Sequence, residues 1–399
     1  MAVVVNEDAP WWPLAHAAVR EGVNLQPQQG LIIRAPIEAH QMVRSVAQVA
    51  YGLGSGPVHC IYEDPELLRI AVASMEPEPS VYSAFPVATK IPVATNMPEA
   101  AQVYIVGPRP RLLQGITTER LLRFHKLFEE PDDSAWAGLA RCTVPYATQD
   151  WASWIRPKLE GGAAQAALWD DILKLCCLNT DLPAQTGLGT QYNRIQDVAD
   201  ELNRLALVSL QLRDQETDLT VDLLGQASWC GGGKQTAAGA FFKPTLPLTP
   251  VQCLLQGSGT HGTLSVGQAI TIGASSVCDL KLEFRRGRVA HLSASQGADL
   301  MERLMQVDDN AARLGQVGLT EAIQGVTSPQ GGFLAPIMDK ACRMHVTLGC
   351  PPQNQNHPGA NHSDIGIDLM FGDSTMEIDG VDANGATVAL FRNGKFRRS

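Results

Sequence analysis

The residues of this chain that could bind a metal ion stand close together near its C-terminal end. His345 is followed by His362 and Asp364, which are two positions apart, and then by Asp368. On a strand, residues at i and i+2 point to the same face, so the pair predicts an imidazole beside a carboxylate. Two histidines and one carboxylate can hold a mononuclear non-haem Fe(II) with coordination positions left open. We therefore predict that His345, His362 and Asp364 bind one metal ion.

Three other polar side chains are candidates for supporting roles around that metal. Asp368 lies four positions after Asp364, and we interpret it as a carboxylate that hydrogen-bonds within the site. His357 and Asp339 are ionisable groups in the same region that could transfer protons to or from a substrate. The other histidines have no spacing partner, so we assign no role to His16, His40, His59, His125, His261 or His291.

In the first half of the chain, short apolar runs alternate with segments of helical periodicity. The strand-like runs are residues 30–36, 56–64 and 101–107. Helices are predicted for residues 37–54, 65–75, 117–130 and 195–214. Strands that alternate with helices indicate a doubly wound parallel sheet. We predict an N-terminal α/β domain over residues 1–215.

The second half is typical of a β-rich domain that must position the candidate ligands. Short strand-like segments are separated by turn residues, and Arg286-Gly287 and Asn393-Gly394 are typical of hairpin turns. One helical pattern, residues 297–315, interrupts them. We predict a mainly β domain over residues 216–399 that carries the metal site. The expected fold class is therefore α/β plus β-rich, in two domains.

Several motifs, in order along the chain, resemble the aminopeptidase S, aminopeptidase T and PepS family of metallo-aminopeptidases. They are "GVNLQPQQGLIIRAPIEAHQMVRSVAQVAYGLG", "TDLTVDL", "WCGGG", "DDNAARLGQVGL", "MDKACRMHVTLG" and "LMFGDSTMEIDG". The resemblance extends over essentially the whole chain. It implies an aminopeptidase-T-like fold with an α/β and a β-rich domain, and a homodimer.

The resemblance also implies a two-metal site, with two glutamates, two histidines and an aspartate as ligands. Aligned by these motifs, the first histidine is His345 and the aspartate is Asp368. The acidic and histidine positions of the other motifs are neutral here: Leu246 and Pro247 stand where the family has two consecutive glutamates, Gln316 stands at the glutamate of a Leu-Gly-Glu stretch, and Gly366 at the second histidine. We interpret Gln316 as a further supporting residue, which hydrogen-bonds where the family has a ligand. Two divalent ions held close together need carboxylates to offset their repulsion, so ordinary aminopeptidase activity is not expected.

A second resemblance concerns the metal ligands alone. The segments "RMHVTLG" and "NHSDI" are similar to those of 2,5-dihydroxypyridine 5,6-dioxygenase, which shares the peptidase fold. This resemblance implies a mononuclear Fe(II) dioxygenase that uses O2 on a small aromatic or heteroaromatic chelating substrate. Zinc or manganese would also accept these ligands. The alternatives are a divergent metallo-aminopeptidase or amide hydrolase, and a catalytically inactive binding protein of the same family.

Charge and hydropathy exclude two classes of partner. The formal net charge is -10, and the only basic run is the short C-terminal tail, so a nucleic-acid partner is not expected. No run of about 18 apolar residues occurs, so no membrane span is expected. The first residues lack the order of a secretory signal, and the nine cysteines include no CxxC pair. We expect a cytoplasmic protein with reduced cysteines.

Overall fold

The structure is a computed structural model. It describes residues 6–74, 99–117, 138–179, 187–225, 228–272, 275–321, 331–349, 359–372 and 375–397, together with residues 120, 323, 325, 326, 328 and 329. The chain forms two compact units. The first unit comprises residues 1–188 and 233–249, and the second comprises residues 189–232 and 250–399.

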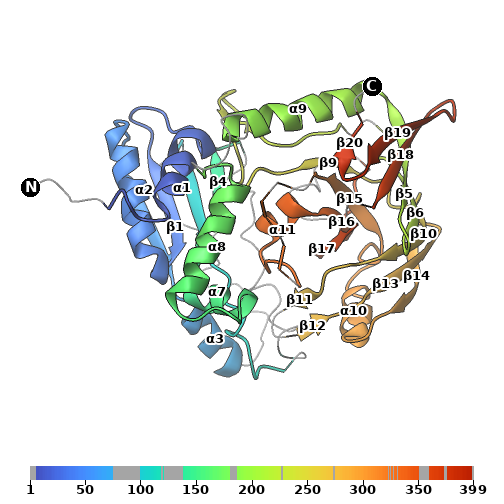
Figure 1. The fold of residues 1–399 in the computed structure, drawn as a ribbon, viewed down its shortest axis with the longest axis horizontal. Helices are drawn as coiled ribbons and strands as arrows, with labels where there is room; N and C mark the ends of the chain where they lie inside the picture. The colour runs from blue at the N-terminus through green and yellow to red at the C-terminus, as the bar shows by residue number, and fades with distance from the viewer. Residues whose placement is uncertain are drawn as a thin grey trace, which may run out of the picture. The chain divides into compact units, whose positions relative to one another are not determined.

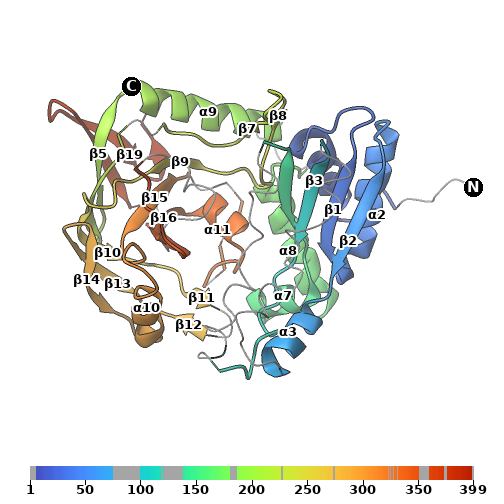
Figure 2. The ribbon, with the colours of Figure 1, turned by 180° about the vertical axis from the view of Figure 1, so that it is seen from behind.

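The first unit contains a parallel sheet in the order β2-β1-β3-β4. Figure 1 labels β1 and β4 of this sheet, and Figure 2, the view from behind, labels β2 and β3. Its strands are β1 (Leu31–Pro36), β2 (Val58–Glu63), β3 (Ala101–Val106) and β4 (Arg141–Pro145). All three neighbouring pairs are parallel. The order reverses direction after β1, as the predicted doubly wound sheet requires. The α/β part of the predicted fold class is confirmed.

Helices of the first unit bury their apolar sides next to this sheet. The main ones are α1 (Trp12–Ala17), α2 (His40–Gly52), α3 (Pro65–Ser74), α7 (Gln149–Ile155) and α8 (Gly162–Leu175). The Trp11 indole joins three of them, because it donates a hydrogen bond to Ser45 of α2 and contacts the ring of Trp169 of α8 just before α1 begins. The short strands β7 (Lys234–Gln235) and β8 (Phe241–Phe242) form a small antiparallel pair.

The second unit contains an eight-stranded antiparallel sheet in the order β14-β13-β10-β6-β5-β18-β19-β20, whose strands are labelled in Figure 1. Strands β5 (Leu207–Arg213) and β6 (Asp218–Asp222) precede β10 (His261–Ser265), β13 (Lys281–Arg285) and β14 (Arg288–Ser293). Strands β18 (Glu377–Asp382), β19 (Thr387–Arg392) and β20 (Lys395–Phe396) complete it. The predicted hairpin turns are confirmed, since Arg286, Gly287, Asn393 and Gly394 all have positive φ.

A second sheet of this unit, β17-β16-β15-β9, has four antiparallel strands and lies beside α11 (Figure 1). The elements are β9 (Val251–Leu254), β15 (Leu314–Leu319), α11 (Pro336–Cys342), β16 (Met344–Gly349) and β17 (Gly366–Phe371). The small pair β11 (Ile270–Ile272) and β12 (Ser275–Val277) lies elsewhere in the sequence, before α10 (Ala298–Leu304). The β-rich part of the predicted fold class is confirmed.

Two predicted helices are shorter than expected. The helix predicted for residues 195–214 is α9 (Leu188–Arg204), and the residues after it form β5. Ala206 has a φ of 46°, which ends the helix, and the segment from Leu207 is held by pairing with β6 and β18. The helix predicted for residues 297–315 ends at Leu304, and β15 begins within that range. The helix predicted for residues 117–130 lies almost entirely outside the described residues.

The boundaries of the two units also differ from the predicted domain boundary after residue 215. Strand β5 pairs with β6 and β18, so residues 207–213 pack with the second unit. As a statement about independently folding domains, the boundary after residue 215 stays a prediction. Among the described helices, none is both long enough and apolar enough to cross a membrane.

Candidate functional site

The four-stranded sheet has one apolar face and one face that carries polar side chains. Residues that are opposite each other on neighbouring strands point to the same side of a sheet. Val317 is opposite Val346, which is opposite Leu369, so these side chains share the apolar face. The pairings Gln316 with Thr347, Thr347 with Asp368, and Gly318 with His345 define the other face. We call it the polar face; its residues are Gln252, Leu254, Gln316, Gly318, His345, Thr347, Asp368 and Met370.

His345 lies at the centre of the polar face and is completely buried. Its imidazole lies directly over Gly318, where a Cβ would come within 2.0 Å of the ring. Neither ring nitrogen has a hydrogen-bond partner among the described residues. Burial, with a smaller contribution from the positive charge of Lys340, lowers the pKa of His345 to about 3, although Asp368 opposes the shift. The imidazole is therefore neutral at physiological pH.

Asp368 is the carboxylate of the polar face. The Lys340 ammonium on α11 lies 2.6 Å from Oδ2, and the Thr347 hydroxyl donates a hydrogen bond to Oδ1 at 2.7 Å. Burial opposes ionisation, but the positive charge of Lys340 and the hydrogen bonds from Lys340 and Thr347 keep the pKa of Asp368 below its usual value. Lys340 was not among the residues singled out in the sequence, although it stands inside the "MDKACRMHVTLG" motif. Its spacing from His345 fits neither a helical nor a strand period, so no pattern pointed to it.

His362 and Asp364 are not part of the polar face. Both are exposed, and they lie in an irregular segment before β17, so the same-face argument for a strand does not apply to them. The segment is held through its backbone. Asp308 accepts a hydrogen bond from the Asp364 amide, and the His362 carbonyl accepts one from the Asn310 side chain. The structure therefore does not bring the predicted set His345, His362 and Asp364 together.

Asp339 has a structural position instead of one in a proton-transfer path. It is buried at the start of α11, where its two oxygens accept hydrogen bonds from the backbone amides of Phe333 and Ala335, at 2.7 and 3.1 Å. Burial raises its pKa to about 6, against the effect of these hydrogen bonds and of the Gln268 side chain. His357 lies outside the described residues.

The polar face does not fit a centre with two divalent metal ions. In the part of the chain that the structure describes, no three His, Cys, Asp or Glu side chains form a group that could hold a metal ion. Gln316 is buried but neutral, and both oxygens of Asp368 already bind Thr347 and Lys340. Leu246 is buried in the first unit, where its backbone amide donates to the Thr143 carbonyl, and its side chain offers no ligand atom.

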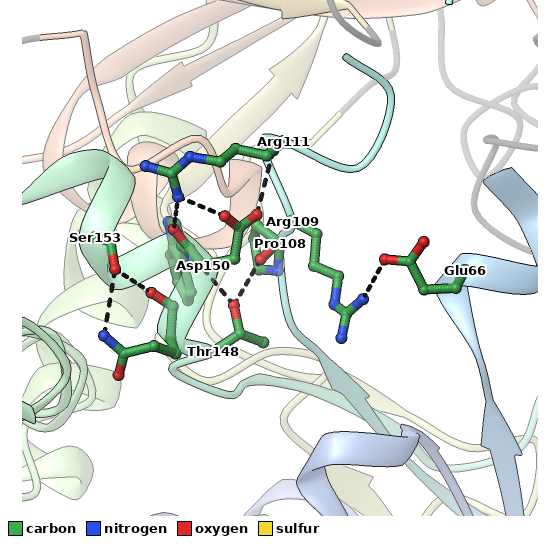
Figure 3. A network of polar contacts seen from close by, with 9 residues as sticks. Glu66, Pro108, Arg109, Arg111, Thr148, Asp150 and Ser153 are labelled. Carbon is green, nitrogen blue, oxygen red and sulfur yellow. Dashed lines mark hydrogen bonds and ion pairs between the residues drawn. The ribbon is translucent and has the colours of Figure 1, made fainter. Parts of the chain in front are cut away.

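The carboxyl ends of the strands in the first unit form a second polar region, shown in Figure 3. Ligands commonly bind at this edge of a doubly wound sheet. Here Arg109, after β3, forms ion pairs with Glu38 and Glu66, and Arg111 forms one with Asp150 at 2.5 Å. The Asp150 carboxylate also accepts from the Arg111 amide. Both arginines are engaged by these three carboxylates, so we interpret the network as structural.

The chain is similar to known proteins over nearly its whole length. The sequence profile of the family described as "Thermophilic metalloprotease (M29)" matches residues 12–396. The chain therefore belongs to this family of metalloproteases. It is 26% identical to "Aminopeptidase AmpS" of Bacillus subtilis over 406 residues, which cover 96% of this chain and 97% of that protein. It is 28% identical to "Aminopeptidase T" of Thermus thermophilus over 400 residues, with the same coverage of both.

A solved structure supports the same relationship. The structure titled "Wild-type AmpT from Thermus thermophilus" matches with a TM-score of 0.83 and 25% sequence identity, over 98% of this chain and 100% of that one. The resemblance to the aminopeptidase S and T family and the aminopeptidase-T-like fold are confirmed.

The predicted dioxygenase activity is wrong. The family is one of metalloproteases, and relatives that match nearly the whole chain are named aminopeptidases, which are hydrolases; none of these relatives supports an oxidoreductase. Fe(II), O2 and an aromatic chelating substrate lose their basis with that activity. The prediction depended on His362 and Asp364 as metal ligands, and both side chains are exposed in the structure.

Proposed function

We propose that this chain is a divergent hydrolase of the aminopeptidase class, which acts on a peptide or an aminoacyl amide at the polar face. The observation that carries the proposal is the M29 match over residues 12–396, together with His345 and Asp368 on one face of one sheet. Because the donor set does not fit two metal ions, we assign no step to metal ions here. A cytoplasmic location and a homodimer are parts of the proposal that rest on the family resemblance.

The residues of the polar face supply complementary groups for an amide. Lys340 is partly exposed, at 24%, so its ammonium is a hydrogen-bond donor that a carbonyl oxygen can reach. A fixed positive charge stabilises the negative charge that develops on this oxygen when an amide is attacked. His345 is neutral and deeply buried, so its imidazole offers one acceptor nitrogen and adds no charge to the face. Asp368 holds the ammonium in place.

A substrate screen tests the proposal. We expect the purified chain to release the chromophore from at least one aminoacyl anilide or short peptide, and the Lys340→Ala variant to lose at least about ten-fold in kcat/KM, since one oxyanion donor contributes 10²–10³ in other enzymes. The screen is run after chelation and again with zinc, cobalt or manganese. Aminopeptidase T of Thermus thermophilus, assayed in parallel, is the positive control. Absence of turnover throughout, with the control active, would reject the hydrolase.

A catalytically silent binding protein is the second candidate. It is favoured by Gln316, which is neutral, and by the Asp368 carboxylate, whose oxygens are both in use. Calorimetric titration with the same anilides and peptides separates the two. Binding that needs Lys340 but is never followed by turnover would establish this second function.

A further inference from the structure

Lys340 and Asp368 form an ion pair at the point where the polar face meets α11. The Nζ–Oδ2 distance is 2.6 Å, and the side chains are 24% and 18% exposed. The other carboxylate oxygen accepts a hydrogen bond from Thr347 at 2.7 Å. Both oxygens of the carboxylate are thus engaged by the protein's own donors, and one of these donors carries a full positive charge.

His345 lies in the same electrostatic environment. Its imidazole interacts with both Lys340 and Asp368, and its two nitrogens have no hydrogen-bond partner among the described residues. A buried polar group without a partner is costly, so such a group is retained where it contacts something else or where its position has a use. The polar face therefore combines one carboxylate, one neutral imidazole and one permanent cation.

A divalent ion and an ammonium compete for the same carboxylate. To bind between His345 and Asp368, a metal ion would have to displace Lys340 from Oδ2 and then remain near its positive charge. Gln316 would supply only a neutral amide oxygen from the adjoining strand. Lys340 already supplies the positive charge that neutralises the Asp368 carboxylate.

We propose that the Lys340 ammonium is the resident cation of the polar face, where it stands in place of a divalent metal ion and presents an N–H to the carbonyl oxygen of a bound amide. The second half of this proposal rests on the proposed function. The first half does not, because it concerns only which cation neutralises Asp368. No bond is made or broken in this step, since Lys340 donates a hydrogen bond and remains protonated.

Metal binding by the full chain tests whether Lys340 takes the place of a divalent metal ion. We expect chelated and desalted wild-type protein to retain less than one zinc, cobalt or manganese ion per chain after incubation, and to show no increase in Tm with these ions. Gln316→Glu adds a carboxylate but keeps Lys340, and should behave like wild type. The double variant Gln316→Glu/Lys340→Ala leaves an imidazole and two carboxylates, which suit zinc with one open position. It should bind one ion per chain and gain Tm with zinc.

Two further variants serve as controls. Lys340→Arg keeps the charge and should still exclude metal. Lys174 forms an ion pair with Asp170 at the same 2.6 Å and is 27% exposed, so Lys174→Ala removes a comparable lysine far along the chain and should leave metal binding unchanged. Circular dichroism confirms that each variant is folded, and Gln316→Glu/Lys340→Gln, which also removes the positive charge, replaces the double variant if the latter unfolds.

Two results would overturn the proposal. One is stoichiometric metal in the wild-type protein that raises its Tm. The other is a folded double variant that gains neither metal nor Tm. Both readouts are independent of turnover, so they decide the identity of the cation even if the substrate screen rejects the hydrolase.

Discussion

At the scale of single residues, His345 keeps its position because the neighbouring strand has no side chain there. Gly318 is opposite His345, and the imidazole fills the space that a Cβ would take. The motif around His345 predicts this histidine as a site residue, and that role stays a prediction. The space that Gly318 leaves for the imidazole was not predictable. It depends on which residue of β15 is opposite His345, and the sequence around a single strand does not determine this register.

Gly318→Ala should displace the imidazole. A methyl group 2.0 Å from the ring forces the side chain or the strand to move, and overpacking of this kind costs about 1–3 kcal/mol in free energy of unfolding. Urea unfolding measures the loss. Gly267→Ala is the control, since its Cβ would lie 3.7 Å from the end of Arg343 and has room. Equal stability of the two variants would contradict the packing described for His345.

The other site residues show what sequence spacing can and cannot provide. Asp368 was expected to support the site, and the structure places it on the same face as His345, whereas His362 and Asp364 are exposed. The pair His362 and Asp364 and the pair Gly366 and Asp368 have the same spacing and lie four residues apart in the sequence. They differ in structure because β17 begins only at Gly366, after a segment that Asp308 and Asn310 hold through its backbone.

At the scale of elements, the start of α11 depends on a buried carboxylate. Asp339 accepts hydrogen bonds from Phe333 and Ala335 and so fixes the loop that leads into the helix carrying Lys340. Its pKa is raised from 3.8 to about 6 by burial. The folded state binds the proton of the Asp339 carboxyl more tightly than the unfolded state does. The contribution of this proton to the free energy of unfolding is therefore complete below about pH 4 and is lost as the pH rises towards 6.

Asp339→Asn should therefore flatten the pH dependence of stability. The raised pKa corresponds to about 3 kcal/mol between pH 4 and 6, which the variant cannot show because it does not titrate. The variant should also be less stable at low pH, since one of the two backbone amides loses its acceptor. Urea unfolding of both proteins at several pH values measures the difference. Parallel stability curves across that window would show that Asp339 does not titrate as described.

Elements were predicted well where local pattern and tertiary pairing agree. Strands β1, β2 and β3 and the hairpin turns at Gly287 and Gly394 follow directly from apolar runs and turn residues, whereas β4 was not predicted. The segment after Arg204 was predicted as helix because its leucines suit both periods. Pairing of β5 with two neighbours decided in favour of a strand, and the sequence of a single segment does not contain that information.

At the scale of the whole molecule, the order of the strands bears on where the chain could be divided. Strand β5 lies between β6 and β18 in the eight-stranded sheet. We expect a fragment of residues 216–399 to lack cooperative unfolding, because removal of β5 separates the two parts of that sheet. A fragment of residues 189–399 keeps β5 and most of α9 and should unfold cooperatively in urea. A stable 216–399 fragment would instead support the boundary after residue 215 as a true domain limit.

The same placement of β5 has a consequence during synthesis. Strands β5, β6 and β10 are synthesised before β18 (residues 377–382), which is the other neighbour of β5 in the sheet. Until that late segment leaves the ribosome, the nascent sheet presents an unpaired strand edge with free amides and carbonyls. Such edges recruit other chains, so slow translation or high expression of this protein should favour aggregation of incomplete chains over aggregation of the finished molecule.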